Sequence, residues 1–156
     1  MTVPDVPEWE PERGDPHEVA AENARRKAEA VEGEQVLAAD TVVALGDQLL
    51  AKPADKAEAR AMLARLAGTT HAVVTGVAVR VGGRLAVRTQ ETRVTMRALT
   101  DDELDAYAAS GEGLGKAGGY AIQETADAFV ESVDGPFDNV VGLPVDLVRT
   151  LLAELS

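Results

Sequence analysis

The sequence contains no cysteine, few aromatic residues and few histidines, and these shortages exclude several kinds of chemistry. Without cysteine, the chain forms no disulfide, uses no thiol nucleophile and offers no cysteine-ligated zinc site. Two histidines, His17 and His71, are too few for a histidine-rich metal centre. Aromatic residues are 3% of the 156 residues, so the core must be built mainly from Ala, Val and Leu.

Long hydrophobic runs and positive charge are also scarce. No apolar run approaches the roughly 18 residues of a membrane span, and the opening residues lack the pattern of a signal peptide. The sequence therefore predicts a soluble, cytoplasmic protein that does not bind membranes. Acidic residues outnumber basic ones 27 to 15, which argues against nucleic-acid binding because such binding needs clustered Lys and Arg. The charge balance does not exclude a small anionic ligand, since a few cations inside a cleft suffice to bind one.

Length and residue patterns predict one α/β domain over residues 1–156, with a mixed, twisted sheet flanked by helices. Helices are expected over 16–31, 55–67, 100–110 and from Pro144 onward, where Val145, Val148, Leu151, Leu152 and Leu155 form the expected buried stripe. The apolar run 35–45 is typical of a central strand covered on both faces. Gly82-Gly83 predicts a hairpin between two strands, the second with a bulge or break near Gln90.

Asp40 is the first candidate for chemistry, because it lies inside the apolar run LAADTVV. A buried carboxylate without a partner costs several kcal/mol or stays protonated, so it needs a cation, a metal or a water-filled cleft. The alternative is a surface position at the end of a strand.

Three lysines and a glutamine form the second group of candidates. Lys52 lies in the turn LLAKPAD, Lys116 lies in the glycine-rich loop GLGKAGGY, and Lys27 lies on the first helix. A glycine-rich loop together with a lysine suits a phosphate group, because glycine lets the backbone approach and the ammonium offsets charge. The Gln123 amide could read the edge of a base. Solvated lysines and an ordinary strand residue are the alternatives.

Several blocks in one order resemble the Maf family of nucleoside triphosphate pyrophosphatases. The blocks are ARRKAEAV, AADTVV, LAKPADKAEARAMLARLAG, HAVVTGVAV, KAGGYAIQ and NVVGLP, and they extend over nearly the whole chain. The blocks around Asp40 and Lys116 are similar to the branch that cleaves dTTP and UTP rather than the branch that acts on 7-methyl-GTP. The resemblance implies the Maf fold and a homodimer.

The same resemblance implies roles for individual residues. Asp40 would be the general base, and Thr41 and Gln123 would help to choose the base of the nucleotide. Lys27, Lys52 and Lys116 match positions that bind phosphate or support the site. Glu8 falls near an acidic, metal-linked position, so Glu8 and Asp40 would hold a divalent ion, Mg²⁺ or alternatively Mn²⁺.

Two departures from the family pattern are visible. The sequence lacks the opening strand and Ser-x-Ser-Pro-Arg-Arg loop of family members, which would grip phosphates, so we expect an N-terminally short member with weak turnover. Glu124 stands where the family often has glycine.

The resulting hypothesis is hydrolysis of dTTP or UTP to the monophosphate and pyrophosphate, which would remove unwanted nucleotides. One alternative is a pyrophosphatase of the 7-methyl-GTP type. Another is a non-catalytic nucleotide-binding protein that restrains septum formation.

Overall fold

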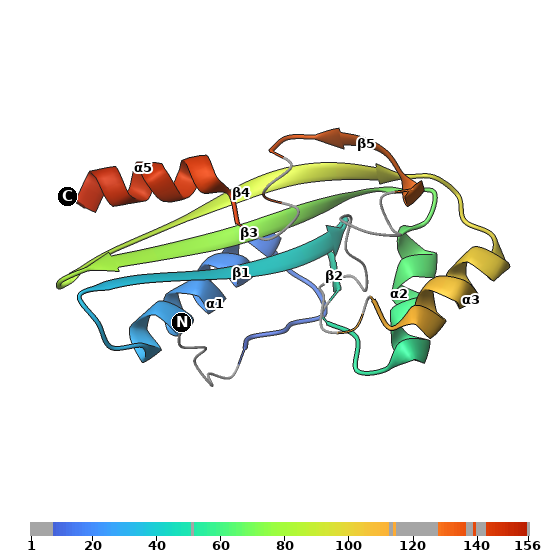
Figure 1. Ribbon diagram of the computed structural model, residues 1–156, viewed down its shortest axis with the longest axis horizontal. Helices are drawn as coiled ribbons and strands as arrows, with labels where there is room; N and C mark the ends of the chain where they lie inside the picture. Colours follow the sequence, from blue (N-terminus) through green and yellow to red (C-terminus); the bar gives the residue numbers. More distant parts are fainter. Residues whose placement is uncertain are drawn as a thin grey trace.

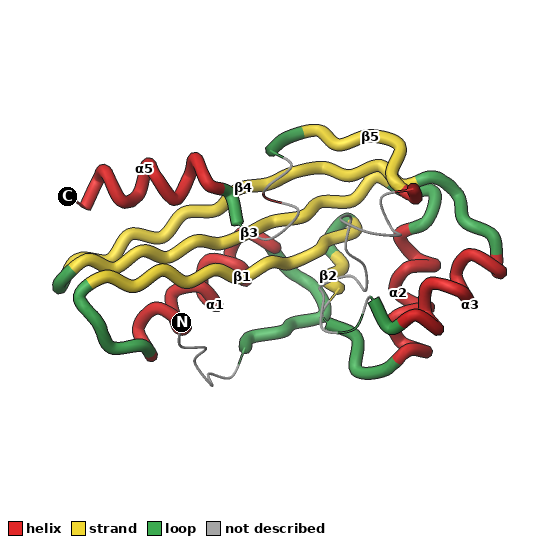
Figure 2. The backbone as a smooth tube through the Cα atoms, in the orientation of Figure 1, coloured by secondary structure: helices red, strands yellow, loops and turns green. Residues whose placement is uncertain are grey.

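The computed structural model of the protein describes residues 8–50, 52–112, 114, 128–136, 139 and 143–155. Its centre is a five-stranded sheet in the order β2-β1-β3-β4-β5. The long strands of this sheet extend along the long axis of the molecule (Figures 1 and 2). The expected α/β class is confirmed. The sheet was expected to be mixed, but every strand pair among the described residues is antiparallel. β3, rather than the run 35–45, is the central strand. The elements are α1 (Pro16–Ala30), β1 (Gln35–Leu45), β2 (Gln48–Leu50), α2 (Lys56–Leu66), β3 (Thr70–Val81), β4 (Arg84–Met96), α3 (Asp101–Ser110), β5 (Val130–Asp134) and α5 (Val145–Leu155).

Helices α1 and α5 cover opposite faces of the sheet (Figure 1). Successive strand residues point to opposite faces, so the even-numbered and odd-numbered residues of β3 meet different helices. Ala78 packs against Ala24 and Ala28 of α1. Val77 and Val79 pack against Val148, Leu151 and Leu155 of α5.

The close fit of α1 against the sheet depends on small residues. Ala20, Ala24 and Ala28 have no exposed surface and share one side of the helix. Ala20 lies against Gly76 of β3, where an added Cβ would lie 2.2 Å from the Ala20 carbonyl oxygen. The backbones of helix and strand are therefore in direct contact at this point.

Both ends of α1 are also held in place. Asp15 caps the N-terminus by accepting a hydrogen bond from the His17 backbone N–H at 2.9 Å. At the C-terminus, the Arg80 guanidinium of β3 donates to the carbonyl oxygens of Ala28 and Val31. A cation at this end also complements the helix dipole.

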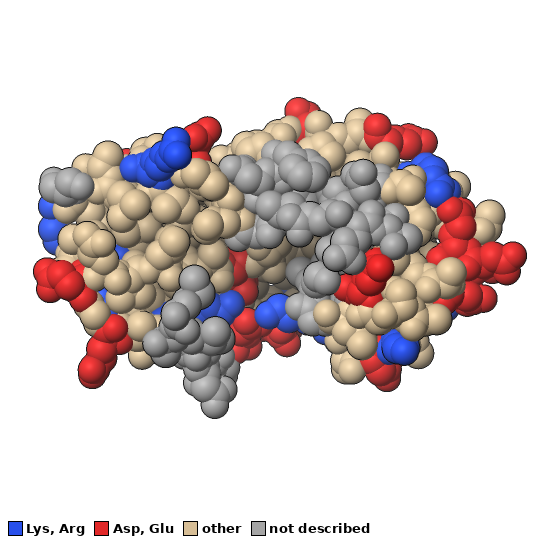
Figure 3. Space-filling model, viewed as in Figure 1, with Lys and Arg blue, Asp and Glu red and all other residues tan. Residues whose placement is uncertain are grey.

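Helices α2 and α3 pack together at one end of the sheet (Figure 1). Arg60 of α2 forms ion pairs with Asp101 and Asp105 of α3. Acidic side chains gather on this end of the molecule in Figure 3. No helix among the described residues has the length and apolar character that crossing a membrane requires.

Two expectations about side-chain patterns were wrong. β4 pairs with β3 in one continuous register from Thr70↔Thr95 to Val81↔Arg84, so there is no bulge near Gln90. The alternation changes because different layers cover β4: Val87 packs towards α1, whereas Val94 projects from the other face into the core with α2 and α3. In α5, Val145 and Leu152 are 40% and 39% exposed instead of belonging to the buried stripe.

Candidate active site

A pocket lies beside the edge of β1. Its walls come from the segment before α1, from α1, from the middle of β1 and from the end of β2, and the lining residues are Glu8, Trp9, Glu10, Pro11, Val19, Asn23, Asp40, Thr41, Val42, Leu49, Leu50 and Lys52. Within the described residues, β2 pairs only with positions 43–45 of β1. The edge of β1 at Asp40–Val42 is thus left to face the pocket.

Asp40 is the buried acid of this pocket. Its side chain is 5% exposed and projects towards α1. Oδ1 accepts a hydrogen bond from Lys27 Nζ at 3.0 Å, and Oδ2 accepts one from Asn23 Nδ2 at 3.2 Å. Asn23 and Lys27 are four residues apart on one helix, so both reach the same strand residue.

Lys27 joins two carboxylates. Its Nζ lies 2.9 Å from Glu8 Oε1 as well as 3.0 Å from Asp40 Oδ1, and it donates to the Ala39 carbonyl oxygen at 3.4 Å. An ammonium group has three donors, so these three acceptors occupy it fully. Lys52 approaches the same Glu8 oxygen at 3.4 Å with a side chain that is 46% exposed. Lys52 is therefore the more accessible cation of the pocket.

The shared charges shift the pKa values of this group. Burial raises the pKa of Asp40, and its contacts with Lys27 and Asn23 offset only part of that effect. Burial would lower the pKa of Lys27, but the two carboxylates outweigh it and raise the pKa. Both pKa values rise, but for different reasons: burial dominates at Asp40, whereas the two carboxylates dominate at Lys27. A raised pKa makes Asp40 a stronger base than an exposed aspartate.

The pKa values of the two carboxyl groups at the mouth of the pocket, Glu8 and Glu10, shift in opposite directions. Burial opposes ionisation of Glu8, but Lys27 and Lys52 together lower its pKa. Burial and the neighbouring Glu8 carboxylate raise the pKa of Glu10. Glu8, which lies between the two lysines, is thus the more acidic of these two carboxyl groups.

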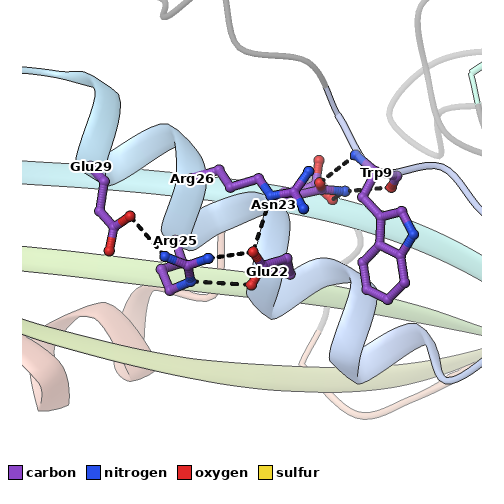
Figure 4. Close-up of polar contacts among 7 residues, drawn as sticks. Trp9, Glu22, Asn23, Arg25, Arg26 and Glu29 are labelled. Carbon is purple, nitrogen blue, oxygen red and sulfur yellow. Dashed lines mark hydrogen bonds and ion pairs between the residues drawn. The ribbon is translucent and has the colours of Figure 1, made fainter.

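Asn23 connects the wall of the pocket to α1. Its Nδ2 donates to the Trp9 carbonyl oxygen at 2.9 Å, and its Oδ1 accepts from the Trp9 backbone N–H at 2.8 Å. Figure 4 shows this double contact, with the Trp9 indole beside the helix and the ion pairs of Arg25 farther along it. Because the same amide also binds Asp40, Asn23 fixes the distance between the acid and the segment that carries Glu8.

Thr41 belongs to the opposite face of the sheet from Asp40. Its Oγ1 lies 3.0 Å from Oγ1 of Thr75, the residue directly across from it on β3. Thr75 Oγ1 donates to the Asn139 carbonyl oxygen at 3.1 Å. The fully buried Asn139 amide donates in turn to carbonyl oxygens of Val73 and Gln90, at 3.0 and 2.9 Å.

The two expected metal ligands, Glu8 and Asp40, are both engaged with a lysine in the structure. No group of three His, Asp or Glu side chains in this part of the chain is placed to hold one. The two carboxylates expected as ligands, Glu8 and Asp40, both turn an oxygen to the Lys27 ammonium. Their role as metal ligands stays a prediction.

The structure brings four of the sequence-predicted residues together, namely Glu8, Lys27, Asp40 and Lys52. Thr41 lines the same pocket from the other face of β1. Lys116, Gln123 and Glu124 lie outside the described residues.

Sequence reasoning missed Asn23, Thr75 and Asn139 as parts of the site. The signal for Asn23 was its place in the helical stripe with Ala20 and Ala24, where an apolar residue would be expected.

His71 is buried in the sheet, and burial lowers its pKa to about 4, so it is neutral at physiological pH.

The fold and pocket define an α/β protein with a buried aspartate between a lysine and an amide, on a part of β1 whose pocket side no described strand pairs with. Residues 1–155 match the family described as Maf-like protein. The chain belongs to the Maf family.

Several curated relatives carry the name dTTP/UTP pyrophosphatase. The protein of Cereibacter sphaeroides is 51% identical over 154 residues, which cover 96% of this chain and 80% of the relative. The proteins of Deinococcus radiodurans and Thermus thermophilus are 49% and 47% identical, each over 88% of this chain and 73% of the relative.

Proposed function

We propose that the protein is a nucleoside triphosphate pyrophosphatase that converts dTTP and UTP to the monophosphate and pyrophosphate. The observation that carries the proposal is the pairing of buried Asp40 with Lys27 and Asn23 beside an accessible lysine. The names of the relatives that match most of the chain support the same substrates.

Asp40 is the group suited to activate water. An attacking water must lose a proton as its oxygen bonds to the α-phosphorus and the bond from this phosphorus to the bridging oxygen breaks. Asp40 accepts that proton, and pyrophosphate leaves with the electron pair of the broken bond. A positioned base of this kind contributes about 10²- to 10⁴-fold to the rate. Lys27 and Asn23 hold the carboxylate in one orientation and keep it from rotating away from the water.

Lys27 and Lys52 have different roles in this mechanism. All three donors of Lys27 are directed at protein oxygens, so its role is to orient Asp40 and Glu8. Lys52 has an exposed side chain and a longer contact with Glu8, so it can turn to the leaving pyrophosphate and offset its charge. We expect Mg²⁺ or Mn²⁺ to arrive bound to the phosphates as part of the substrate. A cytoplasmic location and a homodimer also belong to this proposal.

The test is pyrophosphate release from dTTP, UTP, dCTP and 7-methyl-GTP in the presence of Mg²⁺. We expect dTTP and UTP to have the highest kcat/KM, and hydrolysis in ¹⁸O-water to place the label in the monophosphate. Preference for 7-methyl-GTP would identify the other branch of the family. Binding of dTTP without pyrophosphate release would instead support a regulatory protein and overturn the proposed activity.

A further inference from the structure

The hydrogen-bond chain behind Thr41 has a fixed direction. A carbonyl oxygen can only accept, so the Thr75 hydroxyl must donate its single proton to the Asn139 carbonyl oxygen, 3.1 Å away. Thr75 Oγ1 is therefore the acceptor in its 3.0 Å contact with Thr41 Oγ1. The Thr41 proton points into the protein, and only the lone pairs of Thr41 Oγ1 are left for another molecule.

The anchor of this chain is buried and well held. Thr75 and Asn139 have no exposed surface. The two N–H groups of the Asn139 amide are shared among three acceptors, namely the Val73 carbonyl oxygen of β3 and the Gln90 carbonyl oxygen and Thr92 Oγ1 of β4. These bonds fix the Asn139 backbone over Thr75, so the direction of the chain does not depend on solvent.

Thr41 and Asp40 are placed to contact different ends of the ligand. The two residues are neighbours on β1, line one pocket and project to opposite faces at the open strand edge. A ligand that crosses this edge can place its phosphates near Asp40 and Lys52 and its base near Thr41.

We infer that Thr75 and Asn139 are positioning residues that hold the Thr41 hydroxyl as a hydrogen-bond acceptor, so that the pocket selects a base presenting an imide N–H. Thymine and uracil carry this N–H at N3, whereas cytosine has an unprotonated acceptor nitrogen there. Facing lone pairs repel, so cytosine is rejected. The inference rests on the proposed function in taking a pyrimidine nucleotide as the ligand.

The test compares kcat/KM for dTTP and dCTP in the wild type, Thr75→Val and Thr75→Ser. Valine has the shape of threonine without the hydroxyl, so it frees the Thr41 proton to rotate and donate to cytosine. We expect Thr75→Val to lower the dTTP/dCTP ratio by about tenfold, chiefly through a gain with dCTP, as one misdirected hydrogen bond would do. Thr75→Ser restores the donor and should keep the wild-type ratio.

A matched control comes from the same strand. Thr70 forms a similar pair with Thr95, at 2.8 Å between their Oγ1 atoms, at an exposed position. Thr70→Val should leave the ratio unchanged. In Thr41→Val, the acceptor itself is lost, so the ratio should fall through dTTP, and adding Thr75→Val should lower it no further.

Outcomes for the inference and for the proposed function are separable. An equal change for dTTP and dCTP in Thr75→Val, or an unchanged ratio in Thr41→Val, overturns the inference while turnover of dTTP stands. If Thr75→Val does not fold, the dTTP/dCTP ratios of Thr41→Val and Thr75→Ser test the inference. If the wild type releases no pyrophosphate, the proposed activity fails. Binding of α,β-methylene analogues of dTTP and dCTP to the same variants then tests the base preference alone.

Discussion

Gly76 of β3 lies directly against the backbone of Ala20 in α1, so close that a Cβ on the glycine would be 2.2 Å from the Ala20 carbonyl oxygen. Gly76 is also the residue of β3 that pairs with Asp40 of β1. The point of closest approach between helix and sheet is thus beside the buried acid. This contact sets how far Asn23 and Lys27 reach, because both lie within two turns of Ala20 on the same helix.

We expect Gly76→Ala to push α1 away from the sheet. The obstacle is backbone rather than a flexible side chain, so the free energy of unfolding should fall by about 1–3 kcal/mol, as for other overpacked sites. The kcat for dTTP should fall as well, because Lys27 and Asn23 would no longer hold Asp40. Denaturant titration and pyrophosphate release measure the two effects. Gly83→Ala is the control, since nothing lies within 4 Å of an added Cβ there, and an equal loss in both variants would contradict the argument.

Asn23→Ala should release the segment that carries Glu8 and Trp9 from α1. Two hydrogen bonds to the Trp9 backbone and one to Asp40 disappear together. Trp9 is the single tryptophan, so its fluorescence reports on this segment alone. We expect red-shifted emission and a higher KM for dTTP.

The matched variant for Asn23 is Glu29→Ala, on the exposed side of the same helix. It removes the ion pair with Arg25, and exposed pairs contribute about 0–1 kcal/mol. Its tryptophan emission should equal that of the wild type. Unchanged emission in Asn23→Ala would show that other contacts hold the segment.

Local signals in the sequence were sufficient for most elements. The N-cap Asp15 with Pro16 predicts the start of α1, and Thr100 with Glu103 predicts α3, because side chains next in sequence satisfy the free backbone N–H groups. Gly111 ends α3 with φ at 74°, a conformation that favours glycine. The antiparallel order of the sheet was not predictable in this way, since it depends on pairing between distant segments.

The site was predictable only in part, for a similar reason. Asp40 was identifiable because a charge inside an apolar run needs a partner, and Lys27 is that partner. The pairing of Thr41 with Thr75 depends on the register of β1 against β3. The bond from Thr75 to Asn139 joins residues 64 positions apart, which no local pattern encodes.

His71 should make stability depend on pH. Its folded pKa of about 4 lies below the ordinary 6.5, so the unfolded chain binds a proton more readily. The contribution of neutral His71 is present above pH 6.5 and is lost as the pH falls to 4, by up to about 3 kcal/mol. His71→Gln should weaken this dependence in denaturant titrations between pH 7 and pH 4. An identical slope in wild type and His71→Gln would refute the assignment.

Asp40→Asn should retain the fold and lose activity. The amide has the shape of the carboxylate and can still accept a hydrogen bond from Lys27, but it cannot take a proton from water. We expect kcat for dTTP to fall about 10²-fold or more, with little change in the melting temperature. Asp47→Asn removes an acid whose side chain is 74% exposed and should behave as the wild type. Retained turnover in Asp40→Asn would return Asp40 to a structural role.

Lys27→Met should move the pH dependence of the reaction rather than remove substrate binding. Lys27 lowers the pKa of Asp40 against the larger effect of burial, so loss of the ammonium raises that pKa further. Asp40 then becomes the ionised base only at higher pH, and the acidic limb of the kcat/KM profile should shift upward, with partial recovery of activity in alkaline buffer. Lys56→Met is the matched control, because Lys56 is exposed and its Nζ donates to the Ala109 carbonyl oxygen at 3.1 Å, at a distance from the pocket residues. An acidic limb at the same pH in Lys27→Met and wild type would mean that Lys27 does not set the ionisation of Asp40.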